Sequence, residues 1–337
     1  MKPVVVHVFG KTDLGRTRDH NEDRFLVADL TRREASLLPQ VRDHEVGERG
    51  SLLVVADGMG GAAAGELASE MATEALYGQL VTTWNVDPEP SAQRFAYRLK
   101  EAVEVANSRI HAHATAHPEL RGMGTTMTAV GVLGDQVFLT QVGDSRAYLV
   151  RNGTAHQLTK DQSLTQRLVE AGELTEEEAA RSERRNIILQ ALGPDPRVKV
   201  DLTFQELRRG DVLVLCSDGL SGQVDKEEIA GIAGSATDLQ VACDRLIDLA
   251  NARGGPDNIT VVIARFDGDG LRAAQGDDGA GHQVYPLIDT ETSTEPVPVY
   301  RGSRPPVPAK RARLRLATAA LLGVLLALVI YLFIRKP

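Results

Sequence analysis

Aspartate residues recur where apolar, β-rich runs of this sequence end, and each precedes a small or turn-forming residue; they are Asp57, Asp144, Asp218 and Asp257. A further acidic pair, Glu22-Asp23, precedes the run that starts at Arg24. One Asp-Gly step alone indicates only a turn, because Asp favours turns. Several carboxylates brought close together repel one another and take up protons unless a cation joins them. Because hard oxygen ligands suit Mg²⁺ and Mn²⁺, the set predicts a divalent-cation site.

The runs around these acids predict short strands, at residues 4–8, 24–28, 52–56, 127–133, 136–142, 147–151, 154–158, 212–216 and 259–266. Turn signals at Gly134-Asp135 and Asn152-Gly153 join consecutive runs, which favours antiparallel pairing. Apolar residues share one face over residues 63–80, 93–117 and 237–253, which predicts three helices. Thr237 is the expected cap of the last helix and Gly254 its expected end. Antiparallel strands covered by amphipathic helices predict an α+β sandwich.

Six short blocks, in a fixed order, resemble those of bacterial metal-dependent serine/threonine protein phosphatases of the PPM (type 2C) family. They are RDHNED at 18–23, DGMGG at 57–61, GMGTT at 122–126, GDSR at 143–146, SDGL at 217–220 and GPDN at 255–258. The resemblance covers about residues 8–266, and an ordered set of blocks is far more specific than one Asp-Gly motif. It implies a four-layer α-β-β-α sandwich of two antiparallel sheets flanked by helices.

The resemblance also implies a role for each acidic position around two Mn²⁺ or Mg²⁺ ions. Asp57 would bridge both ions, and the carbonyl of Gly58 would add a ligand. Asp218 would hold one ion directly and Asp257 the other. Asp144, together with Asp218, would offer a third and weaker metal site.

Four other positions would support substrate and metal binding if the resemblance holds. Glu22 and Asp23 would order metal-bound waters, and Asn258 would support the site by hydrogen bonding. Arg18 would bind the substrate phosphate, since a planar guanidinium can bind two phosphate oxygens at once. The resulting mechanism is hydrolysis by a water that two metal ions activate, with no protein nucleophile.

Some segments depart from the family pattern or extend it. Met59 stands where many eukaryotic members carry a histidine, and Ala62 where some bacterial members do, so the group that protonates the leaving oxygen stays open. Residues 30–50 read as an inserted, charged surface connection of unknown purpose. Residues 160–193 correspond to a flap on the substrate side of the family's site.

The composition of the chain changes after Asp267, where the predicted catalytic domain (1–267) ends. Residues 268–315 are rich in Gly, Asp, Thr and Pro and end in a basic stretch, which predicts a flexible linker with a juxtamembrane segment. Residues 316–334 carry no charge over nineteen positions, the length of a single transmembrane helix. The larger basic cluster precedes this span, so we expect a cell-membrane protein with a cytoplasmic catalytic domain. No secretory signal is recognisable at the N-terminus.

The sequence therefore predicts a membrane-tethered, metal-dependent phosphatase for phosphoserine and phosphothreonine in proteins. Its expected partners are phosphorylated proteins, including a membrane-bound serine/threonine kinase. A catalytically weak phosphoprotein-binding regulator of the same fold is the alternative. The formal net charge of −8 argues against nucleic acid as a partner, because phosphate backbones need cationic surfaces.

Overall fold

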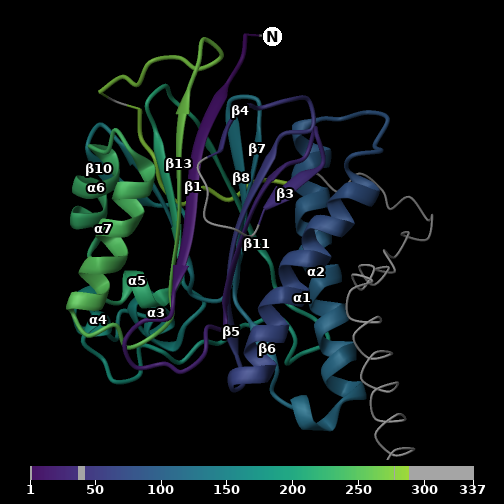
Figure 1. Cartoon of the computed structure of the whole chain (residues 1–337), viewed down its shortest axis with the longest axis vertical. Helices are drawn as coiled ribbons and strands as arrows, with labels where there is room; N and C mark the ends of the chain where they lie inside the picture. Colours follow the sequence, from purple (N-terminus) through teal and green to yellow (C-terminus); the bar gives the residue numbers. More distant parts are fainter. Residues whose placement is uncertain (1, 37–41, 277, 288–337) are drawn as a thin grey trace, which may run out of the picture. The chain divides into compact units, whose positions relative to one another are not determined.

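Two antiparallel β-sheets form the middle of a computed structural model that describes residues 2–36, 42–276 and 278–287 (Figure 1). The strands of the first sheet are, in spatial order, β10 (Thr154–Gln157), β9 (Arg146–Arg151), β12 (Val212–Cys216), β13 (Ile259–Asp267), β1 (Val5–Asp13) and β4 (Arg42–Glu45). Those of the second sheet are β11 (Asp201–Glu206), β8 (Gln136–Val142), β7 (Met127–Leu133), β5 (Ser51–Met59), β2 (Asp23–Asp29) and β3 (Glu34–Ser36). The short strand β6 (Gly124–Thr125) pairs with the end of β5.

Helices cover the outer face of each sheet, which gives four layers (Figure 1). The second sheet packs against α1 (Ala62–Thr83) and α2 (Ala92–Ala116), and the first against α6 (Lys226–Gly234) and α7 (Leu239–Ala252). Shorter elements lie between these, namely η1 (Pro118–Leu120), α3 (Leu164–Glu170), α4 (Glu176–Ala180) and α5 (Asp218–Ser221). The predicted α-β-β-α arrangement of two antiparallel sheets is thereby confirmed.

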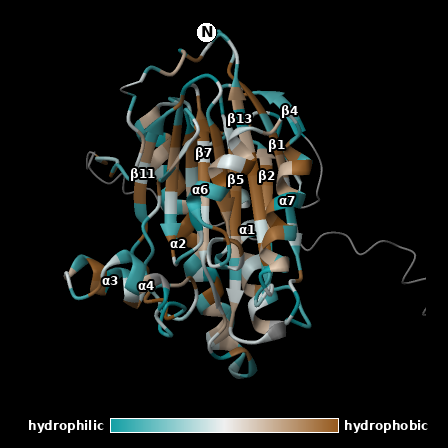
Figure 2. Ribbon diagram, turned by 90° about the vertical axis from the view of Figure 1, so that its left-hand side faces the viewer, coloured by the Kyte–Doolittle hydropathy of each residue, from teal (hydrophilic) through white to brown (hydrophobic). Residues whose placement is uncertain are grey.

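Strand β12 shows why its sequence is apolar without interruption. Successive side chains of a strand point to opposite faces of the sheet. Leu213 and Leu215 accordingly lie in the core between the two sheets, whereas Val214 and Cys216 lie in the core beneath α6 and α7. Both faces of the central strands are therefore buried, and Figure 2 shows them as hydrophobic bands. The thiol of Cys216 is a buried packing group in this strand.

The antiparallel pairing brings the acidic strand ends to one edge of the sandwich. Asp57, near the end of β5, pairs with Asp23, the first residue of β2. In the other sheet Cys216, the last residue of β12, pairs with Val261, near the start of β13. Asp218 therefore follows β12 closely, and Asp257 lies just before the neighbouring strand β13. An antiparallel sheet places the end of one strand beside the start of the next. Acids that are far apart in the sequence therefore meet.

The segment 30–50 differs from the predicted surface loop. It contributes β3 to the free edge of the second sheet and β4 to the free edge of the first. These two strands lack apolar alternation because edge strands tolerate charged residues. The sequence therefore carries no strand signal there. Strand β11 is not predicted either, although Leu202 and Phe204 alternate with polar residues in it. The cap of α7 is Asp238 instead of Thr237, since the Asp238 carboxylate accepts hydrogen bonds from the first turn.

Part of the predicted linker packs against the domain as a strap, residues 268–276 and 278–287. Leu271 is only 2% exposed, and the ring of Tyr285 packs edge-to-face on Phe138 and Phe204. Asp278 accepts hydrogen bonds from both Nε and Nη2 of Arg208, at 2.9 and 3.0 Å. The predicted domain boundary at Asp267 is therefore too early. The Gly- and Asp-rich composition that suggested a linker conceals these few anchoring contacts.

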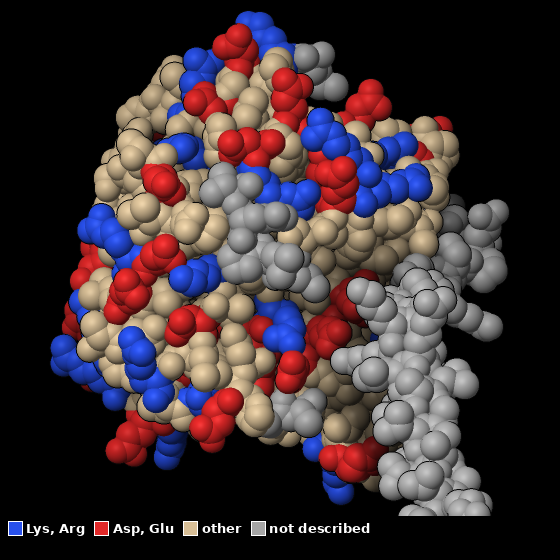
Figure 3. Space-filling model, in the orientation of Figure 1, with Lys and Arg blue, Asp and Glu red and all other residues tan. Residues whose placement is uncertain are grey.

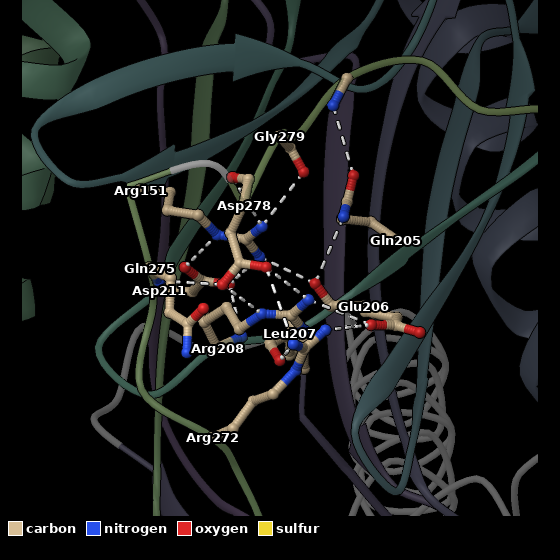
Figure 4. A network of polar contacts seen from close by, with 11 residues as sticks. Arg151, Gln205, Glu206, Leu207, Arg208, Asp211, Arg272, Gln275, Asp278 and Gly279 are labelled. Carbon is tan, nitrogen blue, oxygen red and sulfur yellow. Dashed lines mark hydrogen bonds and ion pairs between the residues drawn. The ribbon is translucent and has the colours of Figure 1, made fainter.

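The strap contacts lie above a buried ion pair (Figure 4). Arg151 donates to both carboxylate oxygens of Asp211, at 2.9 and 2.6 Å, and both side chains are 1% exposed. Arg208, which binds Asp278 of the strap, also donates its backbone N–H to the Asp211 carboxylate of this pair, at 2.7 Å. The strap is thus joined to the interior of the sandwich and not only to its surface.

No helix in the described part of the chain is both long and apolar enough to cross a membrane. The predicted transmembrane span, residues 316–334, and the basic stretch before it lie outside the described residues.

We expect a chain that ends at residue 267 to unfold at a lower temperature than one that ends at residue 287. The shorter chain loses the buried Leu271, and burial of such a side chain contributes about 1.5–3 kcal/mol. For a domain of this size the melting temperature should fall by about 3–10 °C. Thermal unfolding followed by circular dichroism measures the difference. Equal melting temperatures would show that the strap adds nothing to stability.

Candidate active site

A cleft of about 550 Å³ opens at the edge where the acidic strand ends meet. Eight of the nine predicted site residues line it: Arg18, Glu22, Asp57, Gly58, Asp144, Asp218, Asp257 and Asn258. The ninth, Asp23, is fully buried and hydrogen-bonds to Ser217 and Thr260. The structure therefore brings residues from all six sequence blocks into one place. Five blocks contribute an acidic residue, and block 122–126 contributes Thr126. Their individual roles stay predictions.

Hydroxyl groups hold the backbone around Asp57. Its amide donates to Oγ1 of Thr126 at 3.0 Å, and its carbonyl accepts hydrogen bonds from Thr126 N and Thr125 Oγ1. The Thr126 hydroxyl in turn meets that of Ser145 at 2.8 Å, next to Asp144. The Asp57 and Asp144 turns are therefore bonded to each other through two neutral side chains.

A second set of hydroxyls holds Asp23. Its Oδ2 accepts hydrogen bonds from Ser217 Oγ and Thr260 Oγ1, both at 2.7 Å. Ser217 precedes Asp218, and it also accepts the backbone N–H of Thr260 at 3.0 Å. Because these contacts join β2 to β12 and β13, Asp23 connects the two sheets directly behind the cleft.

Two glycines allow the backbone segments of the site to approach closely. A Cβ added to Gly58 would lie 2.2 Å from the carbonyl oxygen of Gly65, and one added to Gly219 would lie 2.0 Å from that of Asn258. Both distances are far below van der Waals contact and involve backbone atoms, which cannot move aside cheaply. The Asp-Gly pairs at 57–58 and 218–219 are thus required by packing as well as by turn formation.

Arg18 and Asn258 organise the rim around Asp257. The Nη2 atom of Arg18 donates to Oδ2 of Asp257 at 2.7 Å, and this hydrogen bond raises the pKa of the guanidinium. The amide of Asn258 donates to the carbonyls of Leu14 and His20, while its oxygen accepts the N–H of Glu22. Asn258 thereby ties the segment that carries Arg18 and Glu22 to the Asp257 turn.

The acidic side chains of the cleft disturb one another strongly. Burial, followed by the charge of neighbouring carboxylates, raises the pKa of Asp57 well above its ordinary value. The same two causes raise the pKa of Asp23 to about 7, of Asp144 to about 8 and of Asp218 to about 6. Burial is also the main cause of the raised pKa of Glu22. Burial and mutual repulsion therefore favour the protonated forms of these carboxyls when no cation is bound.

The donor set fits hard divalent cations. Within the described residues, Oδ1 of Asp23 and Oδ1 of Asp218 are buried with no hydrogen-bond partner. Unpaired buried carboxylate oxygens beside other carboxylates are favourable only with a cation near them. Over the same described ranges, no three acidic, histidine or cysteine side chains converge as a ready ligand set for one ion. The cleft therefore gathers suitable ligands without closing them around a single point.

Several residues of the site carry no strong sequence signal. The hydroxyls of Thr126, Ser145, Ser217 and Thr260 lie within or beside the six blocks, where their position next to an acid is the one available clue. Asn186 and Ile188, from the end of the predicted flap 160–193, line the cleft together with His20 and Met59. The flap itself contains α3 and α4.

A cleft of buried carboxylates with a guanidinium at its rim, set in an α-β-β-α sandwich, is an arrangement that suits a metal-dependent phosphoester hydrolase. Comparison with known sequences makes the family explicit. The sequence model of the family described as protein phosphatase 2C matches residues 41–251. A serine/threonine phosphatase stp of Listeria monocytogenes is 37% identical over 262 residues, which are 78% of this chain and 96% of that protein. The chain belongs to the protein phosphatase 2C family.

Mycobacterial relatives give the same result. The serine/threonine protein phosphatase PstP of Mycobacterium tuberculosis is 44% identical over 213 residues, which are 63% of this chain and 40% of that protein. Its crystal structure superposes with a TM-score of 0.65 at 37% identity, covering 80% of this chain and 99% of that one. The PstP catalytic domain in complex with two manganese ions gives a TM-score of 0.63 at 38% identity, covering 78% and 99%. The predicted family, enzyme class and Mn²⁺ or Mg²⁺ dependence are confirmed at this level.

We expect the protein without divalent cations to lose stability as pH rises from about 4 to 8. The carboxyls with folded pKa values of about 6–8 start from an ordinary value of 3.8, so the folded state holds more protons across this window. Removing those protons costs stability, and Mn²⁺ should restore it. Added Mn²⁺ should therefore raise the melting temperature more at pH 8 than at pH 5.

Differential scanning fluorimetry with and without Mn²⁺ measures this, and Asp57→Asn is the matched variant that removes one repelling charge. It should reduce both the pH dependence and the effect of Mn²⁺. An Mn²⁺ effect that is equal at both pH values and unchanged in Asp57→Asn would show that the ion binds elsewhere.

Proposed function

We propose that this phosphatase hydrolyses phosphoserine and phosphothreonine in proteins at a dinuclear metal site formed by the cleft. The observation that carries the proposal is the convergence of Asp57, Asp218 and Asp257 on one cleft with Arg18 at its rim. Two divalent cations bound to such a carboxylate set lower the pKa of water and offset the negative charge of a phosphate. The relatives named as serine/threonine phosphatases support this substrate class.

The residues of the chain would divide the work as follows. Asp57, Asp218 and Asp257 would hold the cations. The Thr126 hydroxyl accepts the backbone N–H of Asp57, and Oδ1 of Asp257 accepts the backbone N–H of Asn258. Arg18 binds non-bridging phosphate oxygens; to do so it turns from Asp257, with which it shares a single hydrogen bond. Its side chain is 52% exposed, so it can reach a substrate that arrives from solvent.

Phosphoproteins suit the surface better than nucleic acids do. On the face shown in Figure 3, Lys and Arg side chains are interspersed with Asp and Glu and form no continuous basic area. Nucleic-acid binding depends on such an area because each phosphate contact needs a cation. The formal net charge of −8 supports the same conclusion.

We expect the purified full-length protein to release phosphate from a phosphothreonine peptide only when Mn²⁺ or Mg²⁺ is present. EDTA should abolish the release, and Asp218→Asn should lower kcat about 100-fold or more, since loss of one charge-stabilising group in an active site has this size of effect. Asp269→Asn, at a side chain that is 73% exposed and outside the cleft, is the matched control.

Phosphate release that survives both EDTA and Asp218→Asn would contradict the metal mechanism. An absence of release from the unaltered protein would favour the phosphoprotein-binding alternative instead.

We further propose that residues 316–334 anchor the protein in the cell membrane with its catalytic domain in the cytoplasm. The support is the uncharged nineteen-residue run and the basic residues before it. Confinement to the membrane raises the local concentration of membrane-bound targets without new contacts. A membrane-bound serine/threonine kinase that carries phosphorylated residues is therefore the partner that we expect.

Deletion of residues 311–337 should move the protein from the membrane fraction to the soluble fraction, because the apolar run and its adjoining basic residues are lost. Fractionation of cells by ultracentrifugation, followed by immunoblotting, measures the shift. Replacement of the basic residues 310–315 alone is the control for electrostatic attachment. A truncated protein that stays with the membranes would rule out the anchor.

A further inference from the structure

The first two residues after Lys160, at the root of the flap, bind the turn that carries Asp144. The carboxylate of Asp161 accepts hydrogen bonds from Nε and Nη2 of Arg146, at 3.0 and 2.7 Å. Gln162 makes a reciprocal pair with Gly143: its N–H donates to the Gly143 carbonyl at 2.9 Å, and its Oε1 accepts the Gly143 N–H at 3.0 Å. We call these two contacts the flap-root clamp.

Gln162 also connects both ends of the flap. Its carbonyl accepts the N–H of Leu189 at 2.7 Å, and its Nε2 donates to Oδ2 of Asp201, at the start of β11, at 3.0 Å. One residue further on, Ser163 forms a β-bridge with Ile188. The side chain of Gln162 therefore has hydrogen bonds at both its oxygen and its nitrogen, which fixes its orientation.

Neighbouring residues at the end of the flap line two different cavities. Ile188 lines the catalytic cleft, whereas Leu189 and Gln162 line a separate cavity of about 680 Å³ between the flap, β11 and the strap. Most residues between 171 and 187 are exposed. Hydrogen bonds at the root, where Ser163 is buried, therefore connect Asn186 and Ile188 to the body of the domain.

A small phosphoester and a phosphoprotein should make different contacts with the rim of the cleft. The phosphate of either substrate reaches the acids of the cleft and Arg18 at its rim. A protein chain on both sides of the phosphorylated residue must in addition pass the rim, where Asn186 and Ile188 lie. A change in the height of the flap therefore alters contacts that only the larger substrate makes.

We infer that Asp161 and Gln162 are positioning residues, which hold the flap at the height that phosphoprotein substrates require and so favour them over small phosphoesters. The inference rests on the proposed phosphatase function of the cleft. Gln162 does not line the cleft, and replacing it leaves the charge of the site unchanged. In Gln162→Ala the backbone hydrogen bond to Gly143, the residue before Asp144, is kept.

Gln162→Ala in the full-length protein tests the inference. With Mn²⁺ present, KM for a phosphothreonine peptide should rise about three- to tenfold, the range expected for loss of one or two hydrogen bonds. The kcat for the peptide, and both constants for p-nitrophenyl phosphate, should stay within about twofold, because the small substrate does not contact the rim where Asn186 and Ile188 lie.

A structural measurement accompanies the kinetics. Arg181 and Arg184 are exposed in the flap, and trypsin should cut there faster in Gln162→Ala, because the root no longer restrains the segment. The matched control is Gln205→Ala on β11, which loses hydrogen bonds to Glu206 and Gly281 far from the flap root. That variant should show neither the rise in KM nor faster cleavage in the flap.

The outcomes separate the clamp from the phosphatase assignment. An unchanged peptide KM, or equal losses with both substrates, would overturn the inference. If Gln162→Ala fails to fold, Asp161→Asn, which weakens the pair with Arg146, is judged by the same KM and trypsin criteria. An unaltered protein that is inactive on both substrates would refute the proposed function, and the trypsin comparison would still decide whether the root restrains the flap.

Discussion

Repulsion between carboxylates in a buried place is the constraint on which this structure depends. Asp57, Asp144 and Asp218 are kept close together although each raises the free energy of its neighbours' charged forms. Two sheets with uninterrupted apolar strands supply the rigidity that such a gathering needs, because the cores on both faces fix where every strand ends. The cleft thus combines strong electrostatic repulsion with a well-packed sandwich, and a bound cation would reduce that repulsion.

Neutral polar groups make most of the hydrogen bonds that position the acidic residues of the cleft. Hydroxyls of threonine and serine, together with the Asn258 amide, bind backbone and carboxylate atoms around the acids without adding a compensating charge. A lysine or arginine in their place would neutralise the carboxylates that the cation requires. Arg18 adds a cationic group at this rim, and its side chain is exposed and bound to Asp257 by a single hydrogen bond.

The sequence predicts much of this arrangement, for identifiable reasons. Strands β7, β8 and β12 agree residue for residue with their apolar runs, because burial on both faces leaves a clear pattern. The acids are found because their blocks are ordered and specific. The strap and the flap contacts are not found, since a buried Leu271 or a bonded Gln162 in polar surroundings resembles any loop residue until the chain has folded. Which hydroxyl faces which acid likewise depends on pairing across two sheets.

The segment 30–50 has a consequence for behaviour at high concentration. Its strands β3 and β4 occupy one border of each sheet, and in β4 the run Arg42-Asp43-His44-Glu45 presents charge along that border. Unpaired backbone groups on an apolar outer strand would otherwise recruit strands from other molecules, whereas short charged strands discourage this. A homologue without this segment would leave β1 and β2 outermost, and its sheets would be open to intermolecular pairing and aggregation.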